Sequence, residues 1–389
     1  MTTTHSTSPF LDYAAQLREF IGHQSSNGSR GGNKTGELEF NRLALLLFGL
    51  QLAHNAPYRQ FCHSRKVAIK DTKDWTQIPA MPTPGFKELE LTCLEPHRRT
   101  TVFPSSGTTG QQPSRHFHSA DSLSLYEASL LPWFRANLLP VANGAKPHAF
   151  EIPGREETTW LFLTPSHGHS RHSSLVHMFE SVRHEFGSAA SHFTGSVNND
   201  GTWDLDLNAT VSALRDAIVK KRPVILCGTA FTFVHLLDHL DQANLFLRLP
   251  PGSRALETGG YKGRSRILPK AELHALITDL LGIPASHIVC EYGMSELSSQ
   301  AYDSVAGKAT AGGRVFHFPP WARAQIVSPE TGREVGEGET GLIRIFDLAN
   351  VYSVMAIQTE DLGVRRGEGF ELLGRAAMAE PRGCSLRSV

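Results

Sequence analysis

The sequence predicts an α/β fold with a largely parallel sheet flanked by helices. Three short apolar runs are each followed by turn residues, as buried parallel strands often are. These runs cover residues 160–163, 224–226 and 288–289. Helical patterns at 211–220 and 231–240 lie between them, and strands that alternate with helices are typical of a parallel sheet. Beyond residue 310 the chain changes to glycine-punctuated strands such as 341–346, which predicts a smaller β-rich subdomain.

The chain divides into three predicted parts: a helical region at 1–75, an α/β core at 76–310, and a β-rich part with a short tail at 311–389. Within the first part, the polar, glycine-rich stretch 24–36 has no apolar period and predicts a flexible loop. After it, Leu38, Leu45 and Leu52 recur at helical spacing, which predicts a helix buried over much of its circumference. Three prolines in 78–84 predict an extended connector.

The composition argues against several classes of protein. Lys+Arg and Asp+Glu both total 38, so no global field would attract nucleic acid or an anionic membrane, and neither partner is expected. The N-terminus lacks a secretory pattern, and the richest apolar run, 43–52, is too short to cross a bilayer. The five cysteines include no C-x-x-C pair, which argues against a disulfide framework or a structural zinc site. We therefore expect a reduced, cytoplasmic setting.

The strongest local motif is a loop of glycines and hydroxyl residues that follows an apolar pair at 102–103. Its residues are Ser105, Ser106, Gly107, Thr108, Thr109 and Gly110. Glycines let the backbone bend around an anion and the hydroxyl groups add donors, so the loop suits phosphates. It is not a P-loop, because no lysine follows Gly110. On this motif alone, a serine- and glycine-rich surface turn is the alternative.

Four further motifs follow the loop, and they cover residues 257–264, 290–296, 358–363 and 373–375. The ordered series resembles the signature motifs of the adenylate-forming superfamily, which includes acyl-CoA synthetases, luciferases and peptide-synthetase adenylation domains. The resemblance extends over roughly residues 75–389. Within the superfamily, the chain is most similar to the LuxE-type acyl-protein synthetases. The segments that carry this closer likeness are 55–59, 78–82 with 86–87, 258–263 and 380–386.

The resemblance implies a binding site for ATP. In it, the loop closes over the β- and γ-phosphates, and Tyr292 stacks on or flanks the adenine. Asp361 accepts hydrogen bonds from the ribose hydroxyls, although Glu360 replaces the glycine that usually precedes this aspartate. A turn aspartate is the alternative for Asp361. Arg375 would reach the ribose or a phosphate. The other residues assigned to the nucleotide or the acyl carboxylate are Gly259, Gly260, Gly293 and Ser295.

Two charged residues have assigned roles in the same site. Glu296 would hold Mg²⁺, which binds to one or two carboxylates together with phosphate oxygens. Its alternative is a charge at the start of a helix. Arg115 stands where acyl-CoA synthetases have a lysine after the phosphate loop, so its guanidinium would replace that ammonium. A solvated surface arginine is the alternative.

The C-terminal region departs from the longer members of the superfamily. Those members carry a further domain with a lysine that promotes adenylation, whereas no lysine follows Arg375 here, so that domain is expected to be absent. Another cation must then serve, and the candidates are Lys262, Lys87 and Arg264. A solvated loop lysine is the alternative for Lys262.

Cys384 is the predicted acyl acceptor. It lies near Arg382 and Arg387, and nearby cations favour the nucleophilic thiolate. In the LuxE-type family a cysteine near the C-terminus accepts the acyl group before passing it to a partner reductase. An inert tail cysteine is the alternative.

The histidine-rich stretch 166–172, with His177 nearby, is interpreted as a solvent-facing loop ahead of a helix, with a metal site as the alternative. The acid would contact Phe231, Phe233, the segment 165–178 and residues 259–261, which suggests an apolar substrate.

The expected function is therefore activation of a carboxylic acid, expected to be a fatty acid, as an acyl-adenylate with ATP and Mg²⁺. The acyl group would then pass to the thiol of Cys384 or to a partner acyl reductase, through covalent catalysis in two easier steps. An alternative of the same chemistry delivers the acyl group to coenzyme A, a carrier protein or an amine. An alternative of another class is a non-catalytic nucleotide-binding scaffold.

Overall fold

The computed structural model describes residues 8–26, 34–105, 112–140, 157–261, 263–308 and 313–376. The α-helices in these ranges are α1 (Pro9–Ser26), α2 (Lys34–His54), α3 (Ala56–Ser64), α4 (Gly85–Glu88), α5 (Ala120–Leu138), α6 (Ser174–Phe186), α7 (Leu207–Val219), α8 (Ala230–Gln242) and α9 (Lys270–Leu281). Short 3₁₀ turns lie at Ile69–Asp71, Trp75–Gln77, Pro96–Arg98 and Ala285–His287. None of the helices in the described part of the chain is long and apolar enough to cross a membrane.

The first sheet has six strands in the order β11-β10-β9-β8-β4-β5. All neighbours are parallel except the edge pair β10 and β11. The strands are β4 (Thr159–Phe162), β5 (Ser191–Phe193), β8 (Val224–Thr229), β9 (Arg254–Thr258), β10 (Ile288–Tyr292) and β11 (Ala301–Tyr302). The predicted largely parallel sheet is confirmed, and the three predicted strands are β4, β8 and β10.

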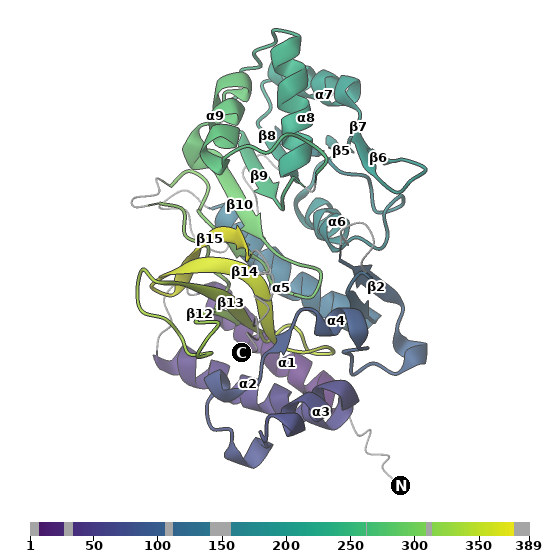
Figure 1. The fold of residues 1–389 in the computed structure, drawn as a ribbon. Helices are drawn as coiled ribbons and strands as arrows, with labels where there is room; N and C mark the ends of the chain where they lie inside the picture. Colours follow the sequence, from purple (N-terminus) through teal and green to yellow (C-terminus); the bar gives the residue numbers. More distant parts are fainter. Residues whose placement is uncertain are drawn as a thin grey trace, which may run out of the picture.

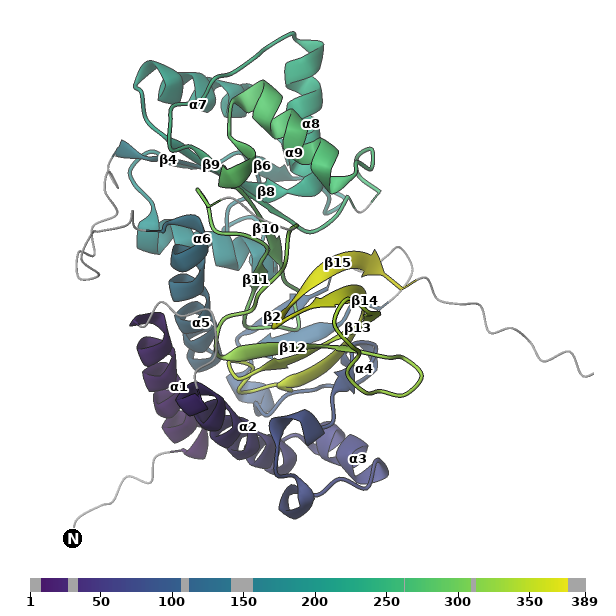
Figure 2. The ribbon, with the colours of Figure 1, turned by 90° about the vertical axis from the view of Figure 1, so that its left-hand side faces the viewer.

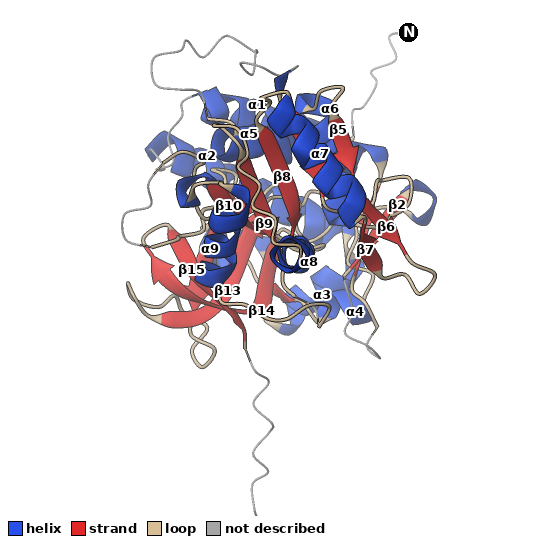
Figure 3. Ribbon diagram, turned by 90° about the horizontal axis from the view of Figure 1, so that it is seen from above, coloured by secondary structure: helices blue, strands red, loops and turns tan. Residues whose placement is uncertain are grey.

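Helices cover both faces of this sheet (Figures 1 and 3). Alternate strand residues point to opposite faces, and the buried side chains divide accordingly into two cores. Leu161, Leu226 and Ile288 pack with residues of α7, α8 and α9. Trp160 and Val289 belong to the other core, which includes α5 and α6. Because both faces are covered, the strands consist of nearly continuous apolar runs, which made them visible in the sequence.

The second sheet has five strands and follows residue 310, apart from one short strand. Its order is β1-β14-β13-β12, with β15 paired to β14, and its strands are β1 (Met81–Pro82), β12 (Ala322–Val327), β13 (Thr340–Asp347), β14 (Ala356–Arg366) and β15 (Gly369–Arg375). The sheet is antiparallel except where β1 joins β14. The extended connector at 78–84 therefore supplies an edge strand. Figure 2 shows this sheet beside the end of β10.

The N-terminal helices pack under the second sheet (Figure 1). Gln51 of α2 donates a hydrogen bond to the Asn350 carbonyl at 2.8 Å, and Tyr13 of α1 is fully buried. The predicted loop 24–36 was too long, since α1 continues to Ser26 and α2 begins at Lys34; residues 27–33 lie outside the described ranges. The prediction that Leu38 belongs to the buried part of this helix is also wrong. Leu38 is 75% exposed, and other residues of α2 form the buried face.

Two short hairpins complete the fold. They are β2 (Thr101–Pro104) with β3 (Arg115–His118), and β6 (Gly195–Val197) with β7 (Trp203–Leu205). The first hairpin carries the predicted phosphate loop between its strands, and residues 106–111 of that loop lie outside the described part of the chain.

Candidate active site

A cavity of about 570 Å³ lies where the carboxyl ends of three parallel strands face the second sheet. Thr229, Thr258 and Glu291 line it from β8, β9 and β10. Asp361 of β14 and Arg375 of β15 line it from the second sheet. Ligands of open parallel sheets bind outside the carboxyl ends of the strands, and the volume is in the range of small-molecule sites.

The base of the predicted phosphate loop reaches this cavity. Ser105, which begins the loop, lines the cavity and bonds across the loop to Ser114: its backbone N–H donates to the Ser114 carbonyl at 3.1 Å, and the Ser114 N–H donates to Ser105 Oγ at 3.0 Å. The Ser114 hydroxyl then donates to Glu296 Oε1 at 2.5 Å. The hairpin therefore places Ser105 and Ser114, which lie on either side of the loop in the sequence, next to the predicted metal ligand.

Glu296 lies in a turn after β10 and is 4% exposed. The alternative of a helix-start charge is wrong, because no helix follows this turn in the described residues. Glu296 Oε2 accepts a hydrogen bond from the Ser295 hydroxyl at 3.1 Å. The buried His116 contacts the Ser295 carbonyl through Nδ1 at 2.7 Å, and burial lowers its pKa to about 4. The ring is therefore neutral at pH 7, and a bond to a carbonyl requires the proton on Nδ1.

Residues at and after the end of β13 in the second sheet hold the turn that carries Ser295 and Glu296. Asp347, at the end of β13, accepts the backbone N–H groups of Ser298 and Ser299 at 2.9 and 2.8 Å. Asn350 donates its side-chain N–H to the Glu296 carbonyl at 2.7 Å. Both residues are buried. Groups distant in the sequence thus fix the backbone on which Ser295 and Glu296 stand.

Asp361 faces the cavity from the middle of β14, so the alternative of a turn aspartate is wrong. The Tyr292 hydroxyl donates to Asp361 Oδ2 at 2.8 Å. Arg375 Nε lies 3.8 Å from Asp361 Oδ1 across the β14–β15 pair. Burial raises the pKa of Asp361, and the hydrogen bond from Tyr292 opposes that shift.

Tyr292 itself is not among the side chains that line the cavity. It is 7% exposed, and its ring makes edge contacts with Phe316, Phe318 and Phe370. The structure therefore shows Tyr292 orienting Asp361, while its role beside adenine stays a prediction.

The predicted glycines differ in their positions. Gly259 and Gly293 line the cavity, and Gly260 does not. Gly259 has φ of +66°, in the region that favours glycine. A Cβ on Gly293 would lie 2.2 Å from Glu291 Oε1, so this glycine leaves space for that carboxyl group.

The cationic side chains predicted for the site also differ in whether they line the cavity. Lys87 and Arg264 line the cavity. Arg115 does not line it: its Nη1 lies 3.6 Å from Glu90 Oε1, and its guanidinium lies over the Phe117 ring. Its assignment to phosphate stays a prediction. Lys262, Ser106, Gly107, Thr108, Thr109, Gly110 and Cys384 lie outside the described residues.

Glu291 is a further residue of the cavity, which the sequence motifs did not indicate. Strand register places Thr229, Thr258, Glu291 and Tyr302 in one row across four neighbouring strands. The Thr258 hydroxyl donates to Glu291 Oε2. Glu291 is 6% exposed, and burial raises its pKa to about 7. One feature of the sequence could have indicated Glu291. It precedes Tyr292 in a predicted strand, so the two side chains must point to opposite faces of the sheet.

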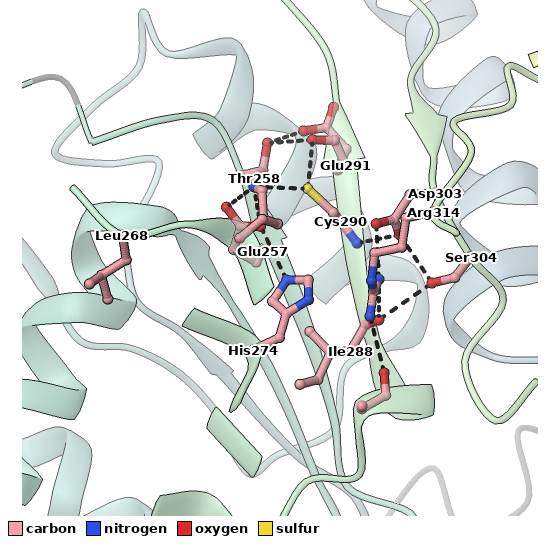
Figure 4. A network of polar contacts seen from close by, with 12 residues as sticks. Glu257, Thr258, Leu268, His274, Ile288, Cys290, Glu291, Asp303, Ser304 and Arg314 are labelled. Carbon is pink, nitrogen blue, oxygen red and sulfur yellow. Dashed lines mark hydrogen bonds and ion pairs between the residues drawn. The ribbon is translucent and has the colours of Figure 1, made fainter. Parts of the chain in front are cut away.

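Behind this row lies a buried polar network on the other face of the strands (Figure 4). Glu257 has no exposed surface, and Lys270 Nζ donates to its two oxygens at 2.9 and 2.6 Å. Lys270 Nζ also lies 3.3 Å from Cys290 Sγ, and His274 Nε2 lies 3.7 Å from Glu257. The buried thiol of Cys227 lies on the neighbouring strand β8, in register with Leu256 of β9, and burial raises its pKa, as it does for Cys290.

Some of the residues predicted to contact the acid line the cavity, and their contact with a substrate stays a prediction. Phe231 and residues of the segment 165–178, such as Leu175 and Met178, line it. Phe233 does not, because it is fully buried in the core beneath α8. His169 and His172 are exposed in the loop before α6, as the solvent-facing interpretation predicts.

Comparison with protein families identifies the chain. The model of the family "Acyl-protein synthetase, LuxE" matches residues 176–388, which is more than half of the sequence. The chain belongs to this family. It is accordingly a ligase of the acyl-protein synthetase type.

Two relatives of this LuxE family member are long-chain-fatty-acid–luciferin-component ligases. The one from Aliivibrio fischeri is 23% identical over 359 residues, which cover 89% of this chain and 86% of the relative. The one from Vibrio harveyi is 23% identical over 347 residues, which cover 86% and 82%.

The fold is that of adenylate-forming enzymes. The crystal structure of 2-hydroxyisobutyryl-CoA ligase in an open conformation, with 2-HIB-AMP and CoA, superposes with a TM-score of 0.60. The identity is 11%, and the match covers 87% of this chain and 70% of the other. The same ligase in its postadenylation state also gives a TM-score of 0.60. The fold class predicted from the sequence is confirmed.

Proposed function

We propose that this LuxE family member activates an aliphatic carboxylic acid, of the fatty acid class, as an acyl-adenylate and then transfers the acyl group to a thiol. The first step joins a carboxylate oxygen of the acid to the α-phosphorus of ATP and releases pyrophosphate. The observation that carries the proposal is the shared cavity: Ser105, Glu296 and Asp361, from three distant segments, all line it. The names of the two fatty-acid ligases among the relatives support the substrate class.

The residues fit a nucleotide at the end of the cavity near the second sheet. The Asp361 carboxylate, oriented by Tyr292, would accept hydrogen bonds from ribose hydroxyls. The loop that starts at Ser105 would contact the phosphates through N–H and hydroxyl donors. Lys87 and Arg264 line the cavity and would attract the pyrophosphate that leaves.

The residues also fit Mg²⁺. Glu296 offers a carboxylate that lines the cavity, and each of its oxygens accepts one hydroxyl hydrogen bond, which leaves lone pairs for a metal ion. A hard cation of this kind prefers carboxylate and phosphate oxygens. Bound there, Mg²⁺ would neutralise phosphate charge. The contribution of this chain is the fixed position of the carboxylate, held by Ser114 and by the anchored turn.

The second step is a thioester transfer to Cys384, as the family assignment suggests. The thiolate sulfur attacks the carbonyl carbon of the mixed anhydride, the C–O bond to AMP breaks, and AMP leaves with the electron pair. The matched family region, 176–388, includes this cysteine. A partner acyl reductase would then take the acyl group.

The test of the first step is carboxylate-dependent ATP–pyrophosphate exchange. We expect exchange with aliphatic acids, and its complete absence with every carboxylic acid would exclude the adenylation and leave a non-catalytic nucleotide-binding protein.

The test of the second step is intact-mass analysis with Cys384→Ser and, as control, Cys93→Ser, which lies away from the cavity lining. We expect a hydroxylamine-sensitive acyl adduct that Cys384→Ser abolishes while exchange continues. An adduct that survives in Cys384→Ser, or acyl transfer to added coenzyme A without any adduct, would contradict the transfer to this cysteine.

A further inference from the structure

The row of residues that contains Glu291 faces a different part of the cavity from the nucleotide residues. Neighbouring residues of a strand point to opposite faces. Tyr292 points to Asp361 of the second sheet. Glu291 points to the face covered by α5, where Tyr126 and Gln300 also line the cavity. Gln300 Nε2 donates to the Tyr126 hydroxyl at 3.2 Å, and a Cβ on Gly293 would contact both Glu291 and Gln300.

Glu291 is only partly satisfied by the protein. Its Oε2 accepts the Thr258 hydroxyl, whereas Oε1 has no hydrogen-bond partner among the described residues. Within the same residues it forms no ion pair, because Lys270 lies on the opposite face of the strands and bonds to Glu257 and Cys290. Glu291 is nevertheless 6% exposed and lines the cavity.

Glu291 lines the cavity, and no described residue donates to its Oε1, so a ligand that carries a donor can supply a hydrogen bond to this oxygen. Apolar side chains lie in the same cavity, among them Met178 and Phe231, and they suit the rest of an aliphatic chain. Burial raises the pKa of Glu291 to about 7, and the hydrogen bond from Thr258 opposes that shift.

We propose that Glu291 selects a carboxylic acid whose chain carries a hydrogen-bond donor, a hydroxyl or an ammonium group, and that this donor binds Glu291 Oε1. The inference rests on the proposed adenylation, and it narrows the substrate class. A site built to bond a substrate O–H or N–H discriminates against the analogue that lacks it, by up to about 10⁴-fold. Tyr126 and Gln300 would surround the same donor.

The experiment compares acids in the ATP–pyrophosphate exchange assay of the whole protein. Each unsubstituted aliphatic acid is paired with hydroxy and amino acids of the same chain length, with the donor at the second carbon or at the chain end. We expect the best donor-bearing acid to exceed its unsubstituted partner by at least about tenfold in kcat/KM. A wild-type preference for the unsubstituted acid at every length overturns the proposal. The better of the hydroxy and amino acids identifies the donor.

Two variants test whether the preference for donor-bearing acids depends on Glu291. Glu291→Leu removes the carboxyl group, and Glu291→Gln keeps its shape; we expect both to lower the ratio between the paired acids, and Glu291→Leu to favour the unsubstituted acid. Glu127→Gln is the matched control, since Glu127 is next to Tyr126 on α5 but pairs with His177 and does not line the cavity. A ratio that stays within about twofold in Glu291→Leu and Glu291→Gln overturns the proposal.

The adenine amino group is the competing donor. If Glu291 binds adenine, Glu291→Leu raises the KM for ATP but not for purine riboside triphosphate, which lacks that amino group, and the acid ratio is unchanged. That result overturns the inference and leaves the adenylation intact. Absence of exchange with every acid in the wild type, by contrast, excludes the proposed function itself.

Discussion

The two ends of the cavity differ in how the protein supports their carboxyl groups. Near the second sheet, both oxygens of Glu296 accept hydroxyl hydrogen bonds, and Asp361 is held by Tyr292. At the other end, only one oxygen of Glu291 has a partner among the described residues. A group that acts on every substrate benefits from a fixed position, whereas a carboxyl oxygen without a donor from the protein favours ligands that carry one. Under the two proposals, this difference separates a reaction centre from a selection site.

The largest expected effect is on the reaction centre. Glu296→Gln should lower acid-dependent pyrophosphate exchange by about 10²- to 10³-fold for every acid, because it removes a charge that organises the phosphates. Glu291→Gln is the comparison, and it should change the ranking of acids rather than abolish exchange. The measurement is exchange at saturating ATP across the paired acids. Equal losses of exchange activity in the two variants, for every acid, would show that the two ends of the cavity do not have different roles.

The network behind Glu291 should matter for stability. Lys270→Ala leaves the fully buried Glu257 without its ammonium partner, and we expect a loss of about 3 kcal/mol in the free energy of unfolding. Lys220→Ala is the control, since Lys220 and Asp216 form an exposed pair at 2.8 Å, and it should cost less than about 0.5 kcal/mol. Urea denaturation measures both. Similar small losses would show that the buried network does not hold β9 and β10 together.

The raised pKa of Glu291 predicts a pH dependence of stability. Its folded pKa of about 7 lies above the value of 4.5 for an unperturbed glutamate, so between these pH values the folded state keeps a proton that the unfolded chain has lost. The free energy of unfolding should therefore fall as pH rises through this interval, by about 3 kcal/mol from this group.

Glu291→Gln removes that contribution while the neighbouring charges, Glu257 and Lys270, remain. The difference in unfolding free energy between the wild type and Glu291→Gln, measured by urea denaturation from about pH 5 to pH 8, should change in the direction that destabilises the wild type at higher pH. A constant difference across this range would mean that Glu291 titrates as an ordinary carboxyl group.

The smallest expected effect concerns the support of Asp361. Tyr292→Phe removes one hydrogen bond of about 1 kcal/mol, which corresponds to roughly a fivefold rise in the KM for ATP. Tyr261→Phe is the control, because the Tyr261 hydroxyl donates to the Leu268 carbonyl at 2.8 Å and makes no contact with Asp361. Steady-state exchange at varied ATP measures both. An unchanged KM for ATP in Tyr292→Phe would show that the hydrogen bond from Tyr292 to Asp361 does not contribute to ATP binding.

The sequence predicted the fold because the parallel strands are buried on both faces and are therefore continuous apolar runs. It also indicated Ser105, Glu296 and Asp361 as parts of one site, through the order of their motifs. It did not show which way a side chain points where a local pattern has two structural outcomes. Arg115 follows the loop in the sequence, but β3 directs its side chain toward Glu90. Phe233 is apolar like Phe231, but it faces the core under α8.

The sequence by itself determined the succession of strands and helices, the five motifs and the family to which the chain belongs. Only the tertiary structure decided which side chains share a face. Glu291 and Tyr292 are adjacent in the chain, yet register with β9 and β11 places one beside Thr258 and Tyr302, and packing against β14 places the other beside Asp361. The neighbours of a strand in a sheet come from distant segments of the chain. The two-residue period of a strand therefore shows that adjacent side chains point to opposite faces, but it does not show which residues each side chain contacts.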